Sequence, residues 1–512
     1  MIQVLLILTI AAILARDPAG KPPGLMFFSS EGILFLWLVP LIVIGAVSHA
    51  LLHWAASRLD RTGSWRVVSA TDWTLGIARW AALLWHVFSI LLLGGLDVVR
   101  RAIGDQIALD ELAATLPLLA LFAYLWYAAF PVERRLREAV LLRQLDSGVP
   151  IHAPPSRGRF VLLQFRHQVL IVVVPIAILL AWSEGWWRLL ARWYPHGSPA
   201  QVSAAHTALQ LLGVLLSLAL LPPLFRLLWH TTRIGPGPLR DDLLALCRAQ
   251  RVRVRDVLVW RTHGSMINGC VLGLWGPLRY VLLTDALLDS LPRDEVQAVM
   301  GHEVGHVVRW HIPWLLAAIL ACTGGCVLVA DLLARAFNLT EPDSPVGGAG
   351  GALLSITLAV CALAGGLLLF GFISRRFEWQ ADAFAAQHLS GWRKSDAGSA
   401  RGTVTPEAAH AMIAALHAVS RLNHVAPRRF SFRHGSIARR VANLRALIGQ
   451  PLSALPIDRH VRIIKGLCAI VLAIVLAAAA YESLSFRTPP SANAPPDTHA
   501  AVNDPSPPGS TP

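Results

Sequence analysis

The sequence predicts a mainly α, polytopic membrane protein of about nine spans, with one small α+β domain outside the bilayer. Of its 512 residues, 55% are hydrophobic and 15% are charged, a balance far on the apolar side of soluble proteins. Apolar stretches of about 20 residues, the length that crosses a bilayer as a helix, recur along the chain. Residues 233–312 and 375–460 instead show strand-like alternation and amphipathic helical patterns.

The apolar stretches predict nine spans in chain order. The first, residues 1–15, is short, and we interpret it as a retained signal anchor, with a cleaved signal peptide as the alternative. The proline pair Pro222-Pro223 predicts a kink or a break near the end of the sixth span. The remaining spans are predicted over residues 32–53, 78–97, 112–132, 168–187, 205–229, 313–335, 349–373 and 463–482.

The formal charge of +14 comes almost wholly from arginine. Nucleic acid is not an expected partner, because no basic-aromatic pattern accompanies the charge. The arginines concentrate in alternate loops between spans, as the positive-inside rule describes. One nine-span topology satisfies this pattern. It places the amino terminus and residues 233–312 and 375–460 in the cytoplasm, and a Pro-rich tail, residues 485–512, outside.

The part outside the bilayer is predicted to contain both strands and helices. Residues 252–262 alternate and are rich in Val, and residues 278–284 have a similar composition, so both predict strands. Asn268-Gly269 between them predicts a turn or a strand edge. One helix is predicted to start close to Pro292, and another to run from Thr405 to about Leu422. The six cysteines form no C-x-x-C pair, so we expect no disulfide framework and no cysteine metal site.

The first of these helices contains the motif His302-Glu303-Val304-Gly305-His306. Residues four apart share a helical face, so His302 and His306 can present two imidazoles to one metal ion. Glu303 lies about 100° around the helix, where a general base for a metal-activated water must stand. A chance occurrence of the pattern is the alternative, and a third ligand is needed to decide.

Glu378, in Phe377-Glu378-Trp379-Gln380-Ala381-Asp382, is the predicted third ligand. It can complete a His2Glu site and leave the fourth position for water. Asp382 lies four residues later on the same helical face, and it can accept the free N–H of a ligand histidine. The alternative is a solvated acidic pair at the end of a membrane helix, which the histidine pair disfavours.

The two motifs together resemble the membrane zinc metallopeptidases, the gluzincin family of the CAAX prenyl endopeptidase and the bacterial membrane heat-shock protease. The resemblance covers about residues 235–450 and includes the two apolar spans between the motifs. Asn268-Gly269-Cys270-Val271-Leu272-Gly273 is similar to the family's Asn-Ala-x-x-x-Gly strand segment, which lines the substrate cleft. His434-Gly435-Ser436-Ile437-Ala438-Arg439-Arg440-Val441 is similar to its His-Pro-Ser-x-x-x-Arg-Ile segment, with Gly435 where Pro is common.

The resemblance implies further roles in the site. Asn268 is expected to bind the substrate backbone as an added strand, and an ordinary Asn-Gly turn is the alternative. His434 is expected to stabilise the developing oxyanion, and Arg440 to anchor that loop or to pair with Asp382. A solvated surface position is the alternative for His434. We interpret the remaining histidines as structural or interfacial, among them His53, His86, His230 and His311.

These inferences define the predicted architecture, a polytopic α-helical membrane protein with a cytoplasmic zincin-type α+β metallopeptidase domain. Its amino-terminal half carries no motif that we can assign. The predicted parts are an amino-terminal transmembrane region of about six spans (1–232), the first half of the peptidase domain with its HExxH helix (233–312), two transmembrane helices (313–374), the second half of the peptidase domain (375–460), a last transmembrane helix (461–484) and a disordered tail (485–512).

The predicted function is a zinc-dependent endopeptidase that hydrolyses membrane-associated or misfolded proteins through a metal-activated water. One Zn2+ per chain is the expected cofactor, and the bilayer and polypeptide substrates are the expected partners. The arginine-rich, lysine-poor composition favours a bacterial inner membrane, with the active site on the cytoplasmic side. The sequence leaves the oligomeric state and the natural substrate open.

Three alternatives to this function are disfavoured by the sequence. An intramembrane metalloprotease is disfavoured, because Arg293, Asp294, Glu295 and Arg309 flank the motif too closely for a hydrocarbon setting. A membrane sensor with a peptidase domain would need a large outer domain, for which the tail is too short. A transporter with a vestigial zinc site is disfavoured by the intact set of ligands, base and supporting carboxylate.

Overall fold

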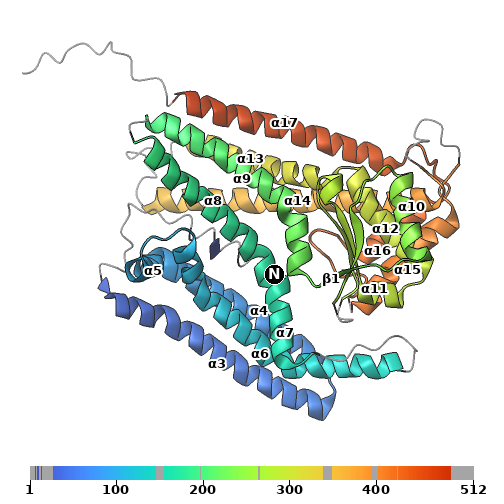
Figure 1. Ribbon diagram of the computed structural model, residues 1–512, viewed down its shortest axis with the longest axis horizontal. Coiled ribbons are helices and arrows are strands. Elements are labelled where there is room, and N and C mark those ends of the chain that lie inside the picture. The colour runs from blue at the N-terminus through green and yellow to red at the C-terminus, as the bar shows by residue number, and fades with distance from the viewer. Residues whose placement is uncertain are drawn as a thin grey trace, which may run out of the picture. The chain divides into compact units, whose positions relative to one another are not determined.

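The computed structural model describes residues 6, 9–10, 13, 27–145, 155–195, 198–262, 266–337, 349–393, 402–423 and 425–485. The predicted class is confirmed: the protein is mainly helical, with a small sheet and several helices long enough to span a membrane (Figure 1). Contacts divide the chain into two compact units. The first comprises Met1–Ile312, Trp379–Ser431 and Gly435–Leu455, and the second comprises Pro313–Glu378, Phe432–His434 and Pro456–Pro512. The predicted domain boundaries stay predictions.

Within the described residues, seven helices are long and apolar enough to cross a membrane, judged by length and composition. They correspond to the predicted second to seventh spans and to the ninth. The predicted first span falls largely outside the described residues, and the predicted eighth lies within α14 (Ala349–Leu389). Helices often extend beyond their apolar stretch, because a helix satisfies its own backbone hydrogen bonds outside the bilayer as well. The third span therefore begins near residue 66 rather than at the predicted residue 78.

The amino-terminal part of the first unit is a helical bundle. Helix α3 packs against both α4 and α6 around buried apolar side chains that include Trp37 and Phe122. The Trp37 indole N–H donates to Nδ1 of His86 over 3.1 Å, which satisfies two polar groups inside this core. The helices of this part are α3 (Ser30–Thr62), α4 (Trp65–Phe88), α5 (Gly95–Ile103), α6 (Leu109–Leu145), α7 (Arg157–Gln164), α8 (Ile171–Trp193) and α9 (Pro199–Leu228), which runs unbroken through Pro222 and Pro223.

A four-stranded sheet with the order β1-β2-β4-β3 follows the bundle in the same unit. Strand β1 pairs with β2 antiparallel, β2 with β4 parallel, and β3 with β4 antiparallel. The predicted strands are confirmed in β2 and β4, and Asn268 directly precedes β3, which forms one edge of the sheet. The strands are β1 (Thr231–Arg233), β2 (Asp256–Trp260), β3 (Gly269–Leu272) and β4 (Tyr280–Thr284).

Several helices of the first unit pack on this sheet or on one another beside it. Helix α12 (Arg293–Val308) packs on the edge strand β3, and α15 (Pro406–Leu422) packs on α12. Both predicted helix starts are confirmed. The Thr405 side chain caps α15 by accepting a hydrogen bond from the backbone N–H of Ala408. The remaining helices of this region are α10 (Pro238–Ala249), α11 (Asp285–Ser290) and α16 (Ile437–Leu447).

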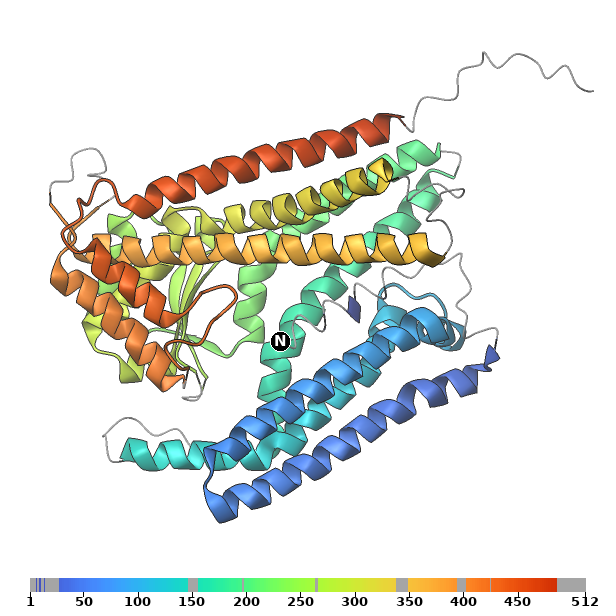
Figure 2. The same cartoon turned by 180° about the vertical axis from the view of Figure 1, so that it is seen from behind.

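The second unit consists mainly of three long helices that run alongside one another (Figure 2). They are α13 (His311–Ala336), the first part of α14 and α17 (Pro456–Ser485). Side chains from all three, among them Cys322, Phe377 and Val461, form one apolar cluster. The six cysteines of the chain are free thiols.

Candidate metal centre

Two glycines allow the helix with the histidine pair to approach α14 closely. A methyl group at Gly305 would lie 3.0 Å from Cδ1 of Phe384, and one at Gly301 would lie 3.4 Å from Cα of Ala385. Because protein interiors are close-packed, larger side chains at these positions would force the two helices apart. Sequence reasoning missed these contacts, although the two glycines are spaced by four residues, one directly before the motif and one inside it.

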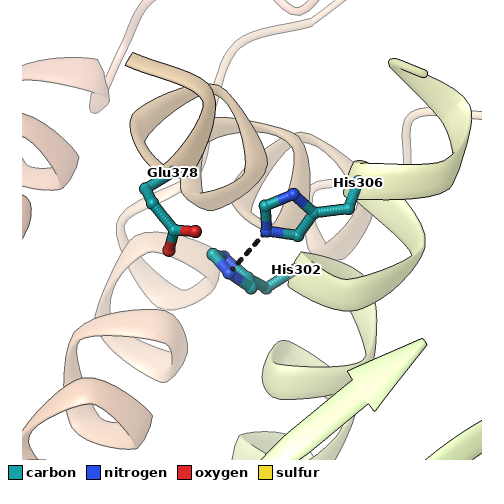
Figure 3. A group of neighbouring side chains, drawn as sticks. All are labelled: His302, His306 and Glu378. Atoms are coloured by element: carbon teal, nitrogen blue, oxygen red, sulfur yellow. Dashed lines mark hydrogen bonds between the residues drawn. The ribbon is translucent and has the colours of Figure 1, made fainter. Parts of the chain in front are cut away.

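The predicted ligands His302, His306 and Glu378 are brought together (Figure 3). One ligand atom from each residue can be chosen so that all three lie within 4.8 Å of one another. The Nε2 atoms of the two histidines are 3.2 Å apart. Two nitrogens bound at 2.0–2.1 Å to one tetrahedral ion would be separated by about 3.3 Å. The two imidazole nitrogens therefore have the separation that a zinc-sized ion requires, and the Glu378 carboxylate lies close enough to be a candidate third ligand.

Local helix geometry places Glu378 with Asp382. Both belong to α14, which continues unbroken through Trp379, and residues four apart share a helical face. The Glu378 side chain is buried, with only 5% of the residue exposed. A buried carboxylate of this kind needs positive charge or hydrogen-bond donors nearby, and a bound cation would supply the charge.

Asp382 contacts His302 on the side away from the candidate metal position. Its Oδ1 atom lies 2.9 Å from His302 Nδ1, and Arg440 donates to both carboxylate oxygens over 2.6 and 2.7 Å. Burial by itself would raise the pKa of Asp382, but the Arg440 charge and the hydrogen bonds from Arg440 and His302 hold it below its usual value. Asp382 is thus a permanent anion at neutral pH. It keeps the proton of His302 on Nδ1, so that Nε2 is free to bind a metal.

Behind His306 lies a contact that the sequence did not reveal. Nδ1 of His306 is 2.9 Å from Nδ1 of His311, and Nε2 of His311 is 2.8 Å from Oε1 of Gln380. His311 is fully buried, with 0% exposed. Its contacts are compatible with the predicted structural role, and they place that role directly beside a candidate ligand. The only signal in the sequence was its position five residues after His306.

Glu303 lies between the histidine pair and the edge of the sheet. A methyl group at Gly269, the first residue of β3, would lie 3.6 Å from Cγ of Glu303 and 3.0 Å from Cγ1 of Val299. The absence of a side chain at Gly269 therefore lets α12 sit directly against the edge strand. This position suits a base that must reach a substrate lying along that strand.

Asn268 holds the start of the edge strand. Its backbone N–H donates to the Thr284 hydroxyl over 3.0 Å, and its carbonyl accepts from the Thr284 N–H over 3.0 Å. Its own side chain is exposed. The residue thus anchors β3 to β4 through its backbone and leaves its amide available to a ligand.

His434 reaches the site from a short loop. Its Nδ1 lies 3.0 Å from Oε2 of Glu378, and 52% of its side chain is exposed. Gly435 adopts a φ of +74°, which proline cannot reach, so the turn differs from the His-Pro-Ser pattern. Arg375 donates to the carbonyl of Phe432 over 2.8 Å and holds the loop on α14. The structure thus brings every predicted site residue to the region of the motif.

Comparisons with known proteins agree with this geometry. Residues 243–448 match the model of peptidase family M48. A protease HtpX homolog from Desulfatibacillum aliphaticivorans is 34% identical over 113 residues, which are 21% of this chain and 34% of that protein. A protease HtpX homolog from Aeropyrum pernix is 27% identical over 236 residues, 45% of this chain and 68% of that protein. A CAAX prenyl protease 1 homolog from Dictyostelium discoideum is 28% identical over 182 residues, 34% of this chain and 42% of that protein.

Among solved structures, that of S. mikatae Ste24p is similar at a TM-score of 0.41 and 16% identity, covering 84% of this chain and 100% of that one. The chain spans about a third of the first curated relative that it matches and about two thirds of the second. The segment matched by the family model contains His302, His306, Glu378, Asp382 and Arg440.

Proposed function

We propose that the protein is a membrane-integrated, zinc-dependent endopeptidase of the M48 type that hydrolyses membrane-associated or misfolded proteins, a proposal that the match of residues 243–448 to peptidase family M48 supports. The observation that carries this proposal is the convergence of His302, His306 and Glu378, with imidazole nitrogens 3.2 Å apart. A single Zn2+ per chain accounts for this donor set. A transporter with a vestigial site is not favoured, because the base and the supporting carboxylate are present beside the ligands.

The residues of the chain divide the proposed chemistry between them. A bound zinc ion would polarise the scissile carbonyl and lower the pKa of water toward about 7. Glu303 accepts a proton from the attacking water and delivers it to the leaving amine. His434, with an exposed imidazole 3.0 Å from Glu378, stabilises negative charge on the carbonyl oxygen. Asp382 and Arg440 hold His302 in the tautomer that binds metal.

The edge strand β3 supports a mode of substrate binding. Among the described residues it pairs only with β4, so its other edge can pair with an extended peptide. Asn268 stands at its start with an exposed amide, and Glu303 lies beside Gly269. An extended polypeptide added to this edge would pass the candidate base, which favours an endopeptidase acting on unfolded segments.

Removal of metal tests the proposal. We expect the full-length protein in nanodiscs to cleave an unfolded membrane-protein substrate, to lose this activity after chelation, and to regain it with stoichiometric Zn2+. Chelator already saturated with zinc is the control for direct effects of the chelator. Undiminished cleavage by protein shown to be metal-free would refute the metallopeptidase assignment.

We also propose that the site faces the cytoplasm of a bacterial cell. The arginine distribution supports this orientation, since cytoplasmic loops carry the excess of positive charge. A reporter that is active only outside the cytoplasm should be active when fused after residue 512, and inactive when inserted near residue 150. The reverse activities would contradict the orientation. Equal activities at the two positions would contradict the prediction that an odd number of spans, the fifth to the ninth, separates residue 150 from the tail.

A further inference from the structure

The candidate ligand His306 rests on a buried pair of polar side chains that no step of the proposed chemistry uses. Its Nδ1 faces Nδ1 of His311 at 2.9 Å, and the far nitrogen of His311 faces the Gln380 side-chain oxygen at 2.8 Å. His311 is 0% exposed and Gln380 is 4% exposed. The side chains of His306, His311 and Gln380 are thus connected by two consecutive hydrogen bonds that lead away from the candidate metal position.

The directions of these hydrogen bonds follow from their chemistry. The Gln380 oxygen can only accept, so Nε2 of His311 carries a proton and donates to it. A neutral His311 then has a bare Nδ1, which must accept from Nδ1–H of His306. This leaves Nε2 of His306 without a proton, and Nε2 is the atom that faces His302 Nε2. The arrangement therefore selects the tautomer of His306 that binds metal.

The backbone is shaped to bring His311 to this position. Helix α12 ends at Val308 and α13 begins at His311. Between them, Trp310 adopts a left-handed conformation with φ of 57°, which is uncommon for a bulky residue. Non-glycine residues in this region are strained and persist where the surrounding structure requires them. The turn sends the chain back so that His311 meets His306 five residues earlier.

We infer that His311 and Gln380 are positioning residues for the metal site, holding the His306 imidazole in orientation and in the Nδ1-protonated tautomer. They orient His306 as Asp382 and Arg440 orient His302. The Nδ1–H of His302 is therefore held by a carboxylate anion, and that of His306 by the neutral imidazole of His311. Mutation of a residue that hydrogen-bonds to a metal-binding histidine typically lowers metal affinity about 10–100-fold. The inference rests on the proposed zinc site and adds residues that determine its affinity.

Zinc affinity measured by chelator competition on the full-length protein tests the inference. His311→Phe removes the acceptor and is expected to weaken zinc binding about 10–100-fold. His311→Asn keeps an oxygen near the place of Nδ1 and should restore most of that loss. Gln380→Met should weaken binding, whereas Gln380→Glu, an obligate acceptor, should bind zinc at least as tightly as wild type. The visible spectrum of the Co2+ form should change in the two weakened variants and not in the two conservative ones.

His388→Phe is the matched control. His388 is also on α14, and its Nδ1 lies 2.8 Å from the side-chain nitrogen of Gln250. Its loss should leave zinc affinity unchanged while removing a comparable internal hydrogen bond. The inference would be overturned if folded His311→Phe bound zinc with the same affinity as His388→Phe. If His311→Phe does not fold, equal affinities of Gln380→Met and Gln380→Glu would overturn it instead. Failure of the wild type itself to bind zinc would refute the proposed function.

Discussion

Replacing Glu303 with Gln is expected to lower kcat for proteolysis by about 10²–10⁴-fold, the usual contribution of a general base. The amide keeps the shape of the side chain but cannot accept a proton from water. Zinc content should be unchanged, because Glu303 is not among the three residues whose atoms converge. Cleavage of an unfolded membrane-protein substrate and metal analysis of the same preparation measure both effects.

Glu295→Gln is the matched control for this variant. Glu295 is in the first turn of the same helix α12, away from the histidine pair. Its replacement should leave cleavage and zinc content at wild-type values. Undiminished cleavage by Glu303→Gln would remove Glu303 as the base, and a loss of zinc from that variant would make Glu303 a ligand instead.

Replacing Glu378 with Ala is expected to lower zinc affinity by more than about 100-fold, because even outer partners of a ligand account for 10–100-fold. The lower zinc affinity should abolish cleavage when zinc is limiting. Excess zinc should restore part of the cleavage activity. His434 would also lose the carboxylate oxygen that lies 3.0 Å from its Nδ1. Zinc occupancy after dialysis at a series of free zinc concentrations is the measurement.

Glu407→Ala controls for the removal of a carboxylate in general. Glu407 is exposed in the first turn of α15 and belongs to no candidate ligand group among the described residues. Its loss should change zinc affinity little. Unchanged zinc affinity in Glu378→Ala would show that another residue completes the site, and the carboxylate would then have only a structural role.

Much of the site was predictable because its elements are local. The distance between His302 and His306 is set by one turn of helix, and the same geometry relates Glu378 to Asp382. The helix cap at Thr405 and the strand at residues 280–284 likewise follow from side chains that are neighbours in sequence. The roles that the family resemblance implied for His434 and Asn268 stay predictions, although both residues lie in the region of the site.

Other features depended on packing between distant segments. Alternation predicted β2 and β4, but it carries no information about strand order, so the exposed edge at β3 appeared only in the structure. The close contact between Gly305 and Phe384 also joins segments far apart in the chain. His311 and Gln380 are 69 residues apart, and neither belongs to a motif with a spacing that would identify it.

The sequence alone therefore predicted the class of the protein, the candidate ligand pair His302 and His306 on α12, Glu378 with its supporting Asp382 on α14, and Glu303 as the candidate base. Those properties follow from helical periodicity and from the apolar length needed to cross a bilayer. Only the tertiary structure decided which side chains support each ligand. That choice depends on how closely two helices approach and on the left-handed turn at Trp310, which are set by packing across the fold rather than by neighbours in the chain.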